Sequence, residues 1–118
     1  MKEITIWHNP RCSKSREAMK ILDEIGVSNE VVKYLETSPN VQEITALLKK
    51  LNLSPRELMR TKEDIYKELN LKDESSEEAL IEAMAQNPKL IERPVLIKGD
   101  KAIIGRPTSI IAKFINFS

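Results

Sequence analysis

The chain has 118 residues, with 19 lysines and arginines against 18 aspartates and glutamates, and a formal net charge of +1. This balance argues against a general nucleic-acid binder, which would show a strong basic excess. No segment approaches the length of a membrane span, so we expect no membrane partner. With one cysteine and one histidine, a zinc site built by this protein is not expected either.

The single cysteine also bears on the setting in which the protein works. One cysteine cannot form an intrachain disulfide. The sequence runs at once into a predicted strand, so we expect no signal peptide. We therefore expect a cytoplasmic protein, and we expect it to be a monomer without a bound cofactor or metal.

The first 35 residues predict a strand, a helix and a second strand. An apolar run at 4–7 is typical of a buried strand. Apolar residues recur at helical spacing from Ala18 to Ile25, and Gly26 follows as a stop signal. A second apolar run at 31–34 predicts another strand. Strand, helix and strand in this order favour parallel pairing with a right-handed crossover.

Residues 40–88 predict a helical block inserted between the two halves of the chain. We expect four helices in this block: an amphipathic one at 41–51, a short one that opens with Ser54-Pro55-Arg56-Glu57 and runs through Met59, one at 65–69, and one capped by Ser75 that ends near Pro88. The block could not bury its apolar faces alone. We therefore predict a single domain over residues 1–118.

The last part of the chain predicts a hairpin and a final helix. Apolar runs at 95–97 and 102–104 are joined by Lys98-Gly99-Asp100-Lys101, which favours a tight turn. Pro107 is expected to start the last helix. A hairpin after the first three elements predicts an α/β fold, with a four-stranded mixed sheet and helices on both faces.

Cys12 is the residue with the clearest chemical signal, because it lies where the first strand turns into the first helix. A helix N-terminus presents unpaired N–H groups and positive potential, which favour the nucleophilic thiolate. Arg11, Lys14 and Arg16 add positive charge nearby. The same N-terminus can bind an oxyanion. The alternative is a small buried hydrophobe, which is disfavoured by the polar residues around Cys12.

Two arginines are expected beside Cys12. The predicted sheet brings Arg93, before the third strand, and Arg106, after the fourth, to the edge where open α/β sheets bind ligands. The guanidinium fork binds oxyanions by two parallel hydrogen bonds. Arg60 is ambiguous, because a cation is favourable at the end of a helix in any case. Solvated surface charges are expected at the remaining candidates, Arg11, Arg16 and Arg56.

Three further positions refine the predicted site. His8 either raises the thiolate population as an imidazolium, or orients the loop through a backbone contact, or only satisfies local hydrogen bonds. Position 15 is a serine, so the chain has no C-x-x-C pair and cannot close a disulfide there. Position 18 is an alanine, which excludes the C-x5-R anion loop of low-molecular-weight phosphatases.

Five ordered motifs resemble the glutaredoxin-linked arsenate reductase family. They are His8-Asn9-Pro10-x-Cys12-x-x-Ser15-Arg16, Tyr34-Leu35-Glu36-Thr37, Leu58-Met59-Arg60, Glu92-Arg93-Pro94-Val95 and Gly105-Arg106-Pro107. The resemblance runs over nearly the whole chain. It implies a thioredoxin-like fold with a helical insertion, which agrees with the predicted elements.

The resemblance also implies roles for individual residues. It implies a nucleophilic cysteine at Cys12 and an oxyanion site formed by Arg60, Arg93 and Arg106. From its place four residues before Cys12, we also expect a catalytic part for His8. Support for the loop is expected from Asn9 and Ser15, and a cis peptide at Pro94.

The activity that the resemblance implies is reduction of arsenate to arsenite through a covalent Cys12 intermediate. Glutathione would be the co-substrate and glutaredoxin the protein partner. Two alternatives stay open: a glutathione-dependent reductase of another substrate, and a regulator of the related Spx type that binds a protein partner. Spx-type regulators carry a C-x-x-C switch, which Ser15 removes from this chain.

Overall fold

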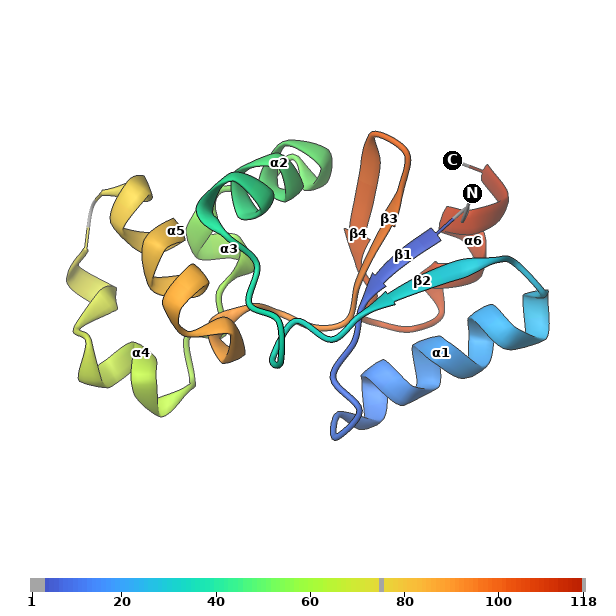
Figure 1. The fold of residues 1–118 in the computed structure, drawn as a ribbon, viewed down its shortest axis with the longest axis horizontal. Helices are drawn as coiled ribbons and strands as arrows, with labels where there is room; N and C mark the ends of the chain where they lie inside the picture. Colours follow the sequence, from blue (N-terminus) through green and yellow to red (C-terminus); the bar gives the residue numbers. More distant parts are fainter. Residues whose placement is uncertain (1–3, 75, 118) are drawn as a thin grey trace. The chain divides into compact units, whose positions relative to one another are not determined.

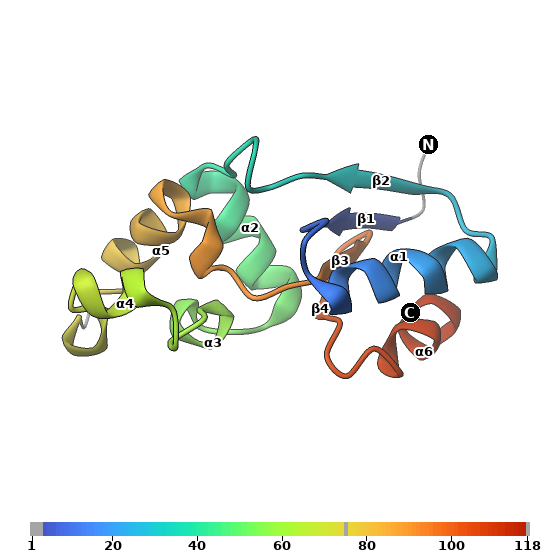
Figure 2. The ribbon, with the colours of Figure 1, turned by 90° about the horizontal axis from the view of Figure 1, so that it is seen from below.

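The computed structural model describes residues 4–74 and 76–117. Contacts divide the chain into two compact units, residues 1–34 with 93–118, and Leu35–Glu92. The second unit contains the predicted helical insertion (Figures 1 and 2). Whether the insertion folds only as part of one domain stays a prediction. In the described part of the chain, no helix is both long and apolar enough to cross a membrane.

The first unit is built on a four-stranded sheet. Its strands are β1 (Ile4–Trp7), β2 (Asn29–Val32), β3 (Val95–Lys98) and β4 (Lys101–Ile104), in the order β2-β1-β3-β4 (Figure 1). β1 pairs in parallel with β2, while β3 runs antiparallel to both β1 and β4. The predicted mixed α/β sheet is thus confirmed, except that Tyr34 lies beyond the end of β2.

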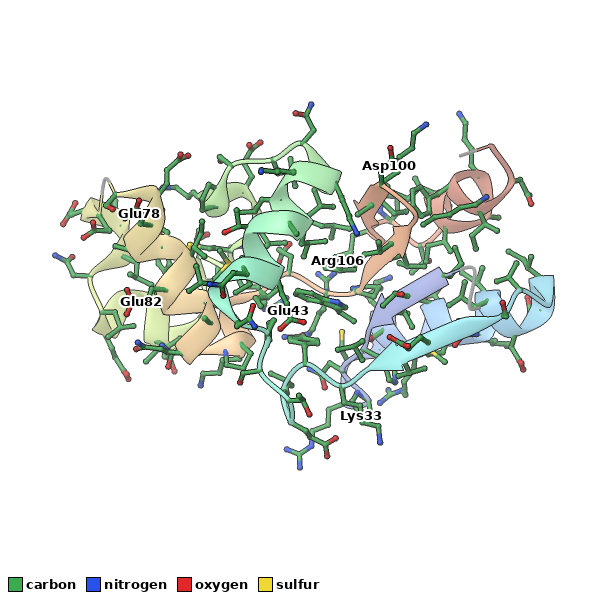
Figure 3. The ribbon with its side chains drawn as sticks, turned by 45° about the horizontal axis from the view of Figure 1, so that its top comes forward. Lys33, Glu43, Glu78, Glu82, Asp100 and Arg106 are labelled. Carbon is green, nitrogen blue, oxygen red and sulfur yellow. The ribbon has the colours of Figure 1, made fainter. Side chains whose placement is uncertain are left out.

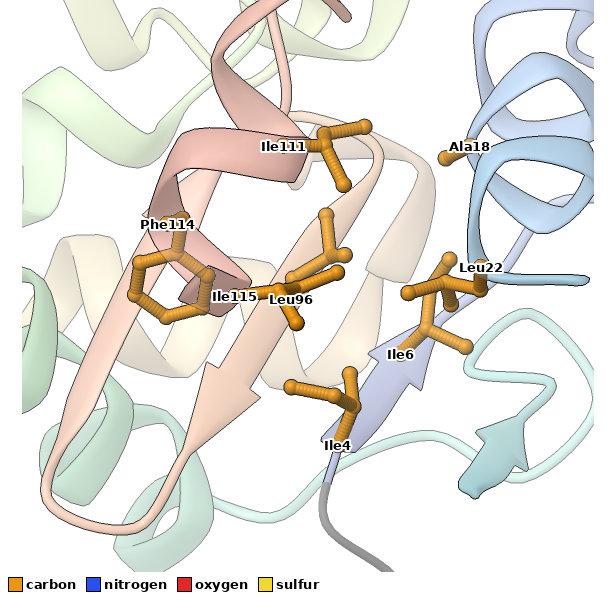
Figure 4. Packing of buried hydrophobic residues seen from close by; sticks show 8 residues of the cluster. All are labelled: Ile4, Ile6, Ala18, Leu22, Leu96, Ile111, Phe114 and Ile115. Atoms are coloured by element: carbon orange, nitrogen blue, oxygen red, sulfur yellow. The ribbon is translucent and has the colours of Figure 1, made fainter. Parts of the chain in front are cut away.

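Two helices pack together on one face of this sheet. Helix α1 (Ser13–Ile25) ends at Gly26, whose φ of 82° suits a residue without a side chain. Helix α6 (Ile110–Phe117) completes the layer. The core between helices and sheet is shown in Figure 4 and comprises Ile4, Ile6, Ala18, Leu22, Leu96, Ile111, Phe114 and Ile115. Among the described residues of this unit the helices are α1 and α6, so a helix on the opposite face stays a prediction.

The expected start of the last helix at Pro107 is wrong. The N–H of Ile110 donates to the carbonyl of Pro107 at 3.2 Å, and the N–H of Ile111 to the carbonyl of Thr108 at 3.1 Å. These bonds span three residues rather than four, so residues 107–109 form a turn. Helix α6 therefore begins three residues later than predicted.

The second unit is helical, as predicted. Its elements are α2 (Val41–Leu51), α3 (Pro55–Leu58), α4 (Asp64–Glu68), the short 3₁₀ turn η1 (Leu71–Asp73), α5 (Glu77–Gln86) and the 3₁₀ turn η2 (Pro88–Leu90). The N–H of Ser54 donates to the Glu57 carboxylate at 2.9 Å, which confirms the predicted start of α3. Ser75, the expected cap of α5, lies outside the described residues, and the Ser76 hydroxyl caps that helix.

Two expectations in this unit are wrong. Met59 lies outside α3, because its extended backbone forms an isolated bridge with Ile91. Arg56 is no solvated surface charge, because its guanidinium donates to the Tyr66 hydroxyl at 2.5 Å and to the carbonyl oxygens of Leu71 and Glu74 at 3.0 and 2.5 Å. Arg56 therefore joins α3 to α4 and to the segment before α5.

Candidate functional site

The pairing of the strands brings three segments of the first unit to one edge of the sheet. Trp7, the last residue of β1, pairs with Val95, the first of β3. Val95 in turn pairs with Ile104, the last residue of β4. The loop after β1, the residues before β3 and the residues after β4 must therefore meet. Figure 3 shows Arg106 at the end of the β3–β4 hairpin opposite the turn that carries Asp100.

The loop after β1 is held by buried polar side chains. Asn9 accepts from the N–H of Arg11 with Oδ1 and from the N–H of Cys12 with its carbonyl oxygen, both at 3.0 Å. The fully buried Ser15 hydroxyl accepts from the N–H of Asn9 at 3.0 Å and lies 2.8 Å from His8 Nδ1. Asn9 and Ser15 thus form hydrogen bonds within the loop, and their role in supporting the site stays a prediction.

Cys12 occupies the N-cap of α1 and is 8% exposed. Arg106 Nη2 lies 3.8 Å from its sulfur. Burial alone would raise the pKa of the Cys12 thiol, but a hydrogen bond from Arg93, the backbone N–H groups of Ser15 and Lys14 and the charge of Arg93 outweigh it. The pKa of Cys12 is lowered to about 7 as a result. Near neutral pH, a large fraction of Cys12 is therefore the nucleophilic thiolate.

Arg93 and Arg106 are joined to each other as well as to the sulfur. Arg106 Nε donates to the carbonyl oxygen of Arg93 at 2.7 Å. Burial lowers the pKa of Arg93, but its interactions with Cys12 and with Tyr34 exceed that effect and raise it. Nε of Arg93 is buried without a hydrogen-bond partner in the structure. A buried donor beside a reactive sulfur suits an oxyanion, whose oxygens would accept from it.

The two arginines are each followed by a cis peptide bond. The Arg93–Pro94 bond is cis, as the resemblance implied, and the Arg106–Pro107 bond, which was not predicted, is cis too. The two segments touch, since the N–H of Gly105 donates to the carbonyl of Pro94 at 2.8 Å. A side chain on Gly105 would meet Leu96, Ile111 and Pro94 at 3.0–3.1 Å. Glycine at this position therefore permits the close approach.

The structure bears on the roles considered for His8. Burial first, and then the positive charges of Lys33 and Arg16, hold its pKa below 6.5. The ring is therefore mostly neutral at neutral pH and bonds to the Ser15 hydroxyl. This argues against an imidazolium beside the thiolate and leaves His8 with a local hydrogen bond inside the loop. A catalytic role for His8 stays a prediction.

Arg60 belongs to the second unit, and its part in an oxyanion site also stays a prediction. Within that unit its Nη1 donates to the Glu92 carboxylate at 3.4 Å, and its Nε lies 3.9 Å from the Glu63 carboxylate. Its backbone N–H donates to the carbonyl of Leu90 at 2.7 Å. These contacts fix the side chain between two acidic residues.

Tyr34 and Trp7 lie at the same sheet edge, but the sequence did not single them out as site residues. Tyr34 is fully buried and its ring stacks on Trp7, with centroids 6.3 Å apart. Its hydroxyl interacts with Arg93. The motif Tyr34-Leu35-Glu36-Thr37 was the available signal. In the described part of the chain, no group of three or more His, Cys, Asp or Glu residues could hold a metal ion.

Fold and site together define a thioredoxin-like protein with one activated cysteine at a helix N-terminus, flanked by two arginines. The chain belongs to the ArsC family, which residues 7–114 match. It is 60% identical over 108 residues to the uncharacterized protein YfgD of Escherichia coli, covering 90% of this chain and 91% of that one. It is 50% identical over 109 residues to an arsenate reductase of Neisseria meningitidis, covering 91% and 93%.

Solved structures agree with these relatives. A putative arsenate reductase from Yersinia pestis superposes with a TM-score of 0.89 at 51% identity, over 93% of this chain and 98% of that one. An arsenate reductase from Vibrio cholerae superposes with a TM-score of 0.91 at 47% identity, over 95% and 97%. Each of these likenesses covers at least 93% of this chain, so it includes most of the inserted helical segment.

Proposed function

We propose that this protein is an oxidoreductase that reduces arsenate to arsenite, with glutathione and glutaredoxin as the source of electrons. The observation that carries the proposal is the cysteine with a pKa of about 7 beside two arginines. Relatives named arsenate reductase, 50% identical in Neisseria meningitidis and 40% identical in Haemophilus influenzae, support the choice of oxyanion.

Binding of the oxyanion uses the charges around the sulfur. Arsenate carries negative charge at neutral pH, and the guanidinium groups of Arg93 and Arg106 offer hydrogen bonds to its oxygens. The backbone N–H groups at the start of α1 add positive potential at the same place. These donors are arranged before the substrate arrives, so little reorganisation is needed as charge develops.

The first chemical step is attack by the Cys12 thiolate on arsenic. A sulfur–arsenic bond forms, an arsenic–oxygen bond breaks, and the departing hydroxide takes a proton from solvent and leaves as water. Arsenic stays pentavalent in this covalent intermediate. The arginines stabilise the negative charge on the remaining oxygens during the displacement.

The second step requires a thiol from outside the chain, because Cys12 is the only cysteine. A glutathione thiolate attacks the Cys12 sulfur and a disulfide bond forms. The electron pair of the sulfur–arsenic bond stays on arsenic, which becomes trivalent and leaves as arsenite. Glutaredoxin then removes glutathione from Cys12 by thiol–disulfide exchange, which restores the free thiol.

The proposal is tested by measuring arsenite release from arsenate with purified protein, glutathione and glutaredoxin. We expect turnover with the wild type and none with Cys12→Ser, whose fold is checked by circular dichroism. Absence of arsenite from the folded wild-type protein would contradict the proposal.

A further inference from the structure

Two side-chain hydrogen bonds connect the start of α1 to the segment that follows β4. In the first, Arg106 Nη2 lies 3.8 Å from the Cys12 sulfur. In the second, the Thr108 hydroxyl donates to Glu17 Oε1 at 2.9 Å. Glu17 lies in the second turn of the helix that Cys12 begins, and Thr108 lies two residues after Arg106. The two bonds therefore run side by side between the same two pieces of chain.

The hydrogen bond between Thr108 and Glu17 differs from an ordinary contact between two exposed side chains. Thr108 is 9% exposed, and a buried hydroxyl needs a partner. The carboxylate of Glu17 supplies one, and a hydrogen bond to a charged acceptor is stronger than one between neutral groups. Lys14 Nζ lies 3.8 Å from the other carboxylate oxygen of Glu17, which favours the same orientation.

The segment that carries Arg106 is irregular, although the N–H of Arg106 donates to the carbonyl of Ile104 and that of Gly105 to the carbonyl of Pro94, both at 2.8 Å. Residues 105–109 belong to no helix or strand, and the Arg106 residue is exposed. Its Nε is fixed by the carbonyl of Arg93, but its backbone lies on the connection between β4 and α6. The guanidinium has to lie close to both the Cys12 sulfur and a bound anion. A displacement of about 1 Å would remove much of its attraction for that anion.

We propose that Glu17 and Thr108 are positioning residues that hold the Arg106 segment against α1 and thereby set the guanidinium of Arg106 over Cys12. The inference deepens the proposed function and rests on it, since it concerns the same oxyanion site. Neither residue touches the reacting atoms. Both act through Arg106. Their loss therefore weakens the attraction of an anion to Cys12 more than it lowers the stability of the fold.

The test compares two alkylating reagents of similar size, anionic iodoacetate and neutral iodoacetamide. Cys12 is the only cysteine, so alkylation followed by mass spectrometry reports on this site alone. The ratio of the two rates measures how strongly the local positive charge attracts an anion. We expect Arg106→Gln to lower this ratio by at least about fivefold, since a charge about 4 Å away is worth about 1 kcal/mol even in water.

Thr108→Val removes the hydroxyl and keeps the shape of the side chain. We expect it to lower the ratio of rates toward that of Arg106→Gln, while Thr108→Ser, which keeps the hydroxyl, retains the wild-type ratio. In the Arg106→Gln background, Thr108→Val should have no further effect, because the pair acts through Arg106.

Substitutions of Glu17, which is exposed, provide a second and independent test. Glu17→Gln loses the charge but keeps an oxygen that accepts from Thr108, so the ratio should equal or exceed that of the wild type. Glu17→Ala loses both. Removal of a negative charge favours iodoacetate, so a lower ratio in Glu17→Ala can come only from the lost hydrogen bond.

A wild-type ratio in a folded Thr108→Val protein would overturn the proposal, and so would an equal drop in the Arg106→Gln background. If Thr108→Val fails to fold, the comparison of Glu17→Ala with Glu17→Gln decides in the same way. The readout needs no arsenate. A protein that releases no arsenite but shows the expected ratios would therefore contradict the proposed function and leave the positioning pair standing.

Discussion

Arg106 Nε donates to the carbonyl oxygen of Arg93 at 2.7 Å, so the side chain of one arginine is positioned by the backbone of the other. The bond uses Nε of the guanidinium, while Nη2 of the same group lies 3.8 Å from the Cys12 sulfur. It also means that the two arginines are not independent.

Substitution of both arginines should therefore weaken oxyanion binding more than either single substitution. We expect Arg93→Ala and Arg106→Ala each to weaken arsenate or sulfate binding by about 1.5–3 kcal/mol, as for a hydrogen bond to a charged group. Isothermal titration calorimetry measures this directly. Binding of arsenate by the double variant as tightly as by the wild type would show that the arginines lie outside the site.

The pH dependence of Cys12 follows from its lowered pKa. Alkylation by iodoacetamide should rise through pH 7 and level off above, whereas an ordinary cysteine titrates at about 8.5. Because the folded pKa is below the unfolded one, the thiolate contributes stability that is fully present above about pH 8.5 and is lost as pH falls through about 7.

Cys12→Ser is the matched control for this linkage. We expect the free energy of unfolding of the wild type, measured by urea titration, to rise between these two pH values, and we expect the variant to lack this gain. An alkylation midpoint at the value of a free cysteine would remove the central premise of the site.

Ser15→Ala should destabilise the loop before α1. The variant leaves the buried N–H of Asn9 without its acceptor and removes the partner of His8 Nδ1. An unsatisfied buried donor costs about 1–3 kcal/mol, which thermal unfolding detects. Ser13→Ala, at an exposed position of the same helix, is the control and should change stability by less than about 0.5 kcal/mol. Equal melting temperatures for both variants would argue against the loop network.

Gly105→Ala should destabilise the junction between the two arginine segments. A methyl group there meets Leu96, Ile111 and Pro94 at 3.0–3.1 Å, and such overpacking costs about 1–3 kcal/mol. Gly99→Asn is the control, because the hairpin turn is open and asparagine tolerates its φ of 61°. A melting temperature of Gly105→Ala equal to that of the wild type would show that the neighbours move aside without cost.

The parts of the fold that follow from local patterns could be predicted from the sequence. The apolar run of β1 and the stop at Gly26 are local signals, and both elements lie where they were expected. The order of the elements along the chain also predicts how the strands are arranged in the sheet. That arrangement in turn predicts that Arg93 and Arg106 meet at one edge of the sheet.

The errors come from tertiary contacts that no local pattern reveals. Pro107 is a common first residue of a helix, but here it belongs to a turn. Arg56 has the sequence context of a surface cation, yet its partner Tyr66 lies ten residues further along the chain and Leu71 fifteen. Likewise, the contact of Thr108 with Glu17 spans 91 residues and has no sequence signature.

The measurement that tests the central claim most directly is intact mass spectrometry of the protein incubated with glutathione, with and without arsenate. We expect one glutathione to be added to Cys12 rapidly only when arsenate is present, because the thiolate must first attack arsenic, and we expect glutaredoxin to remove it. Equally fast formation of the adduct without arsenate would show simple glutathionylation of a reactive cysteine, and would contradict arsenate reduction through Cys12.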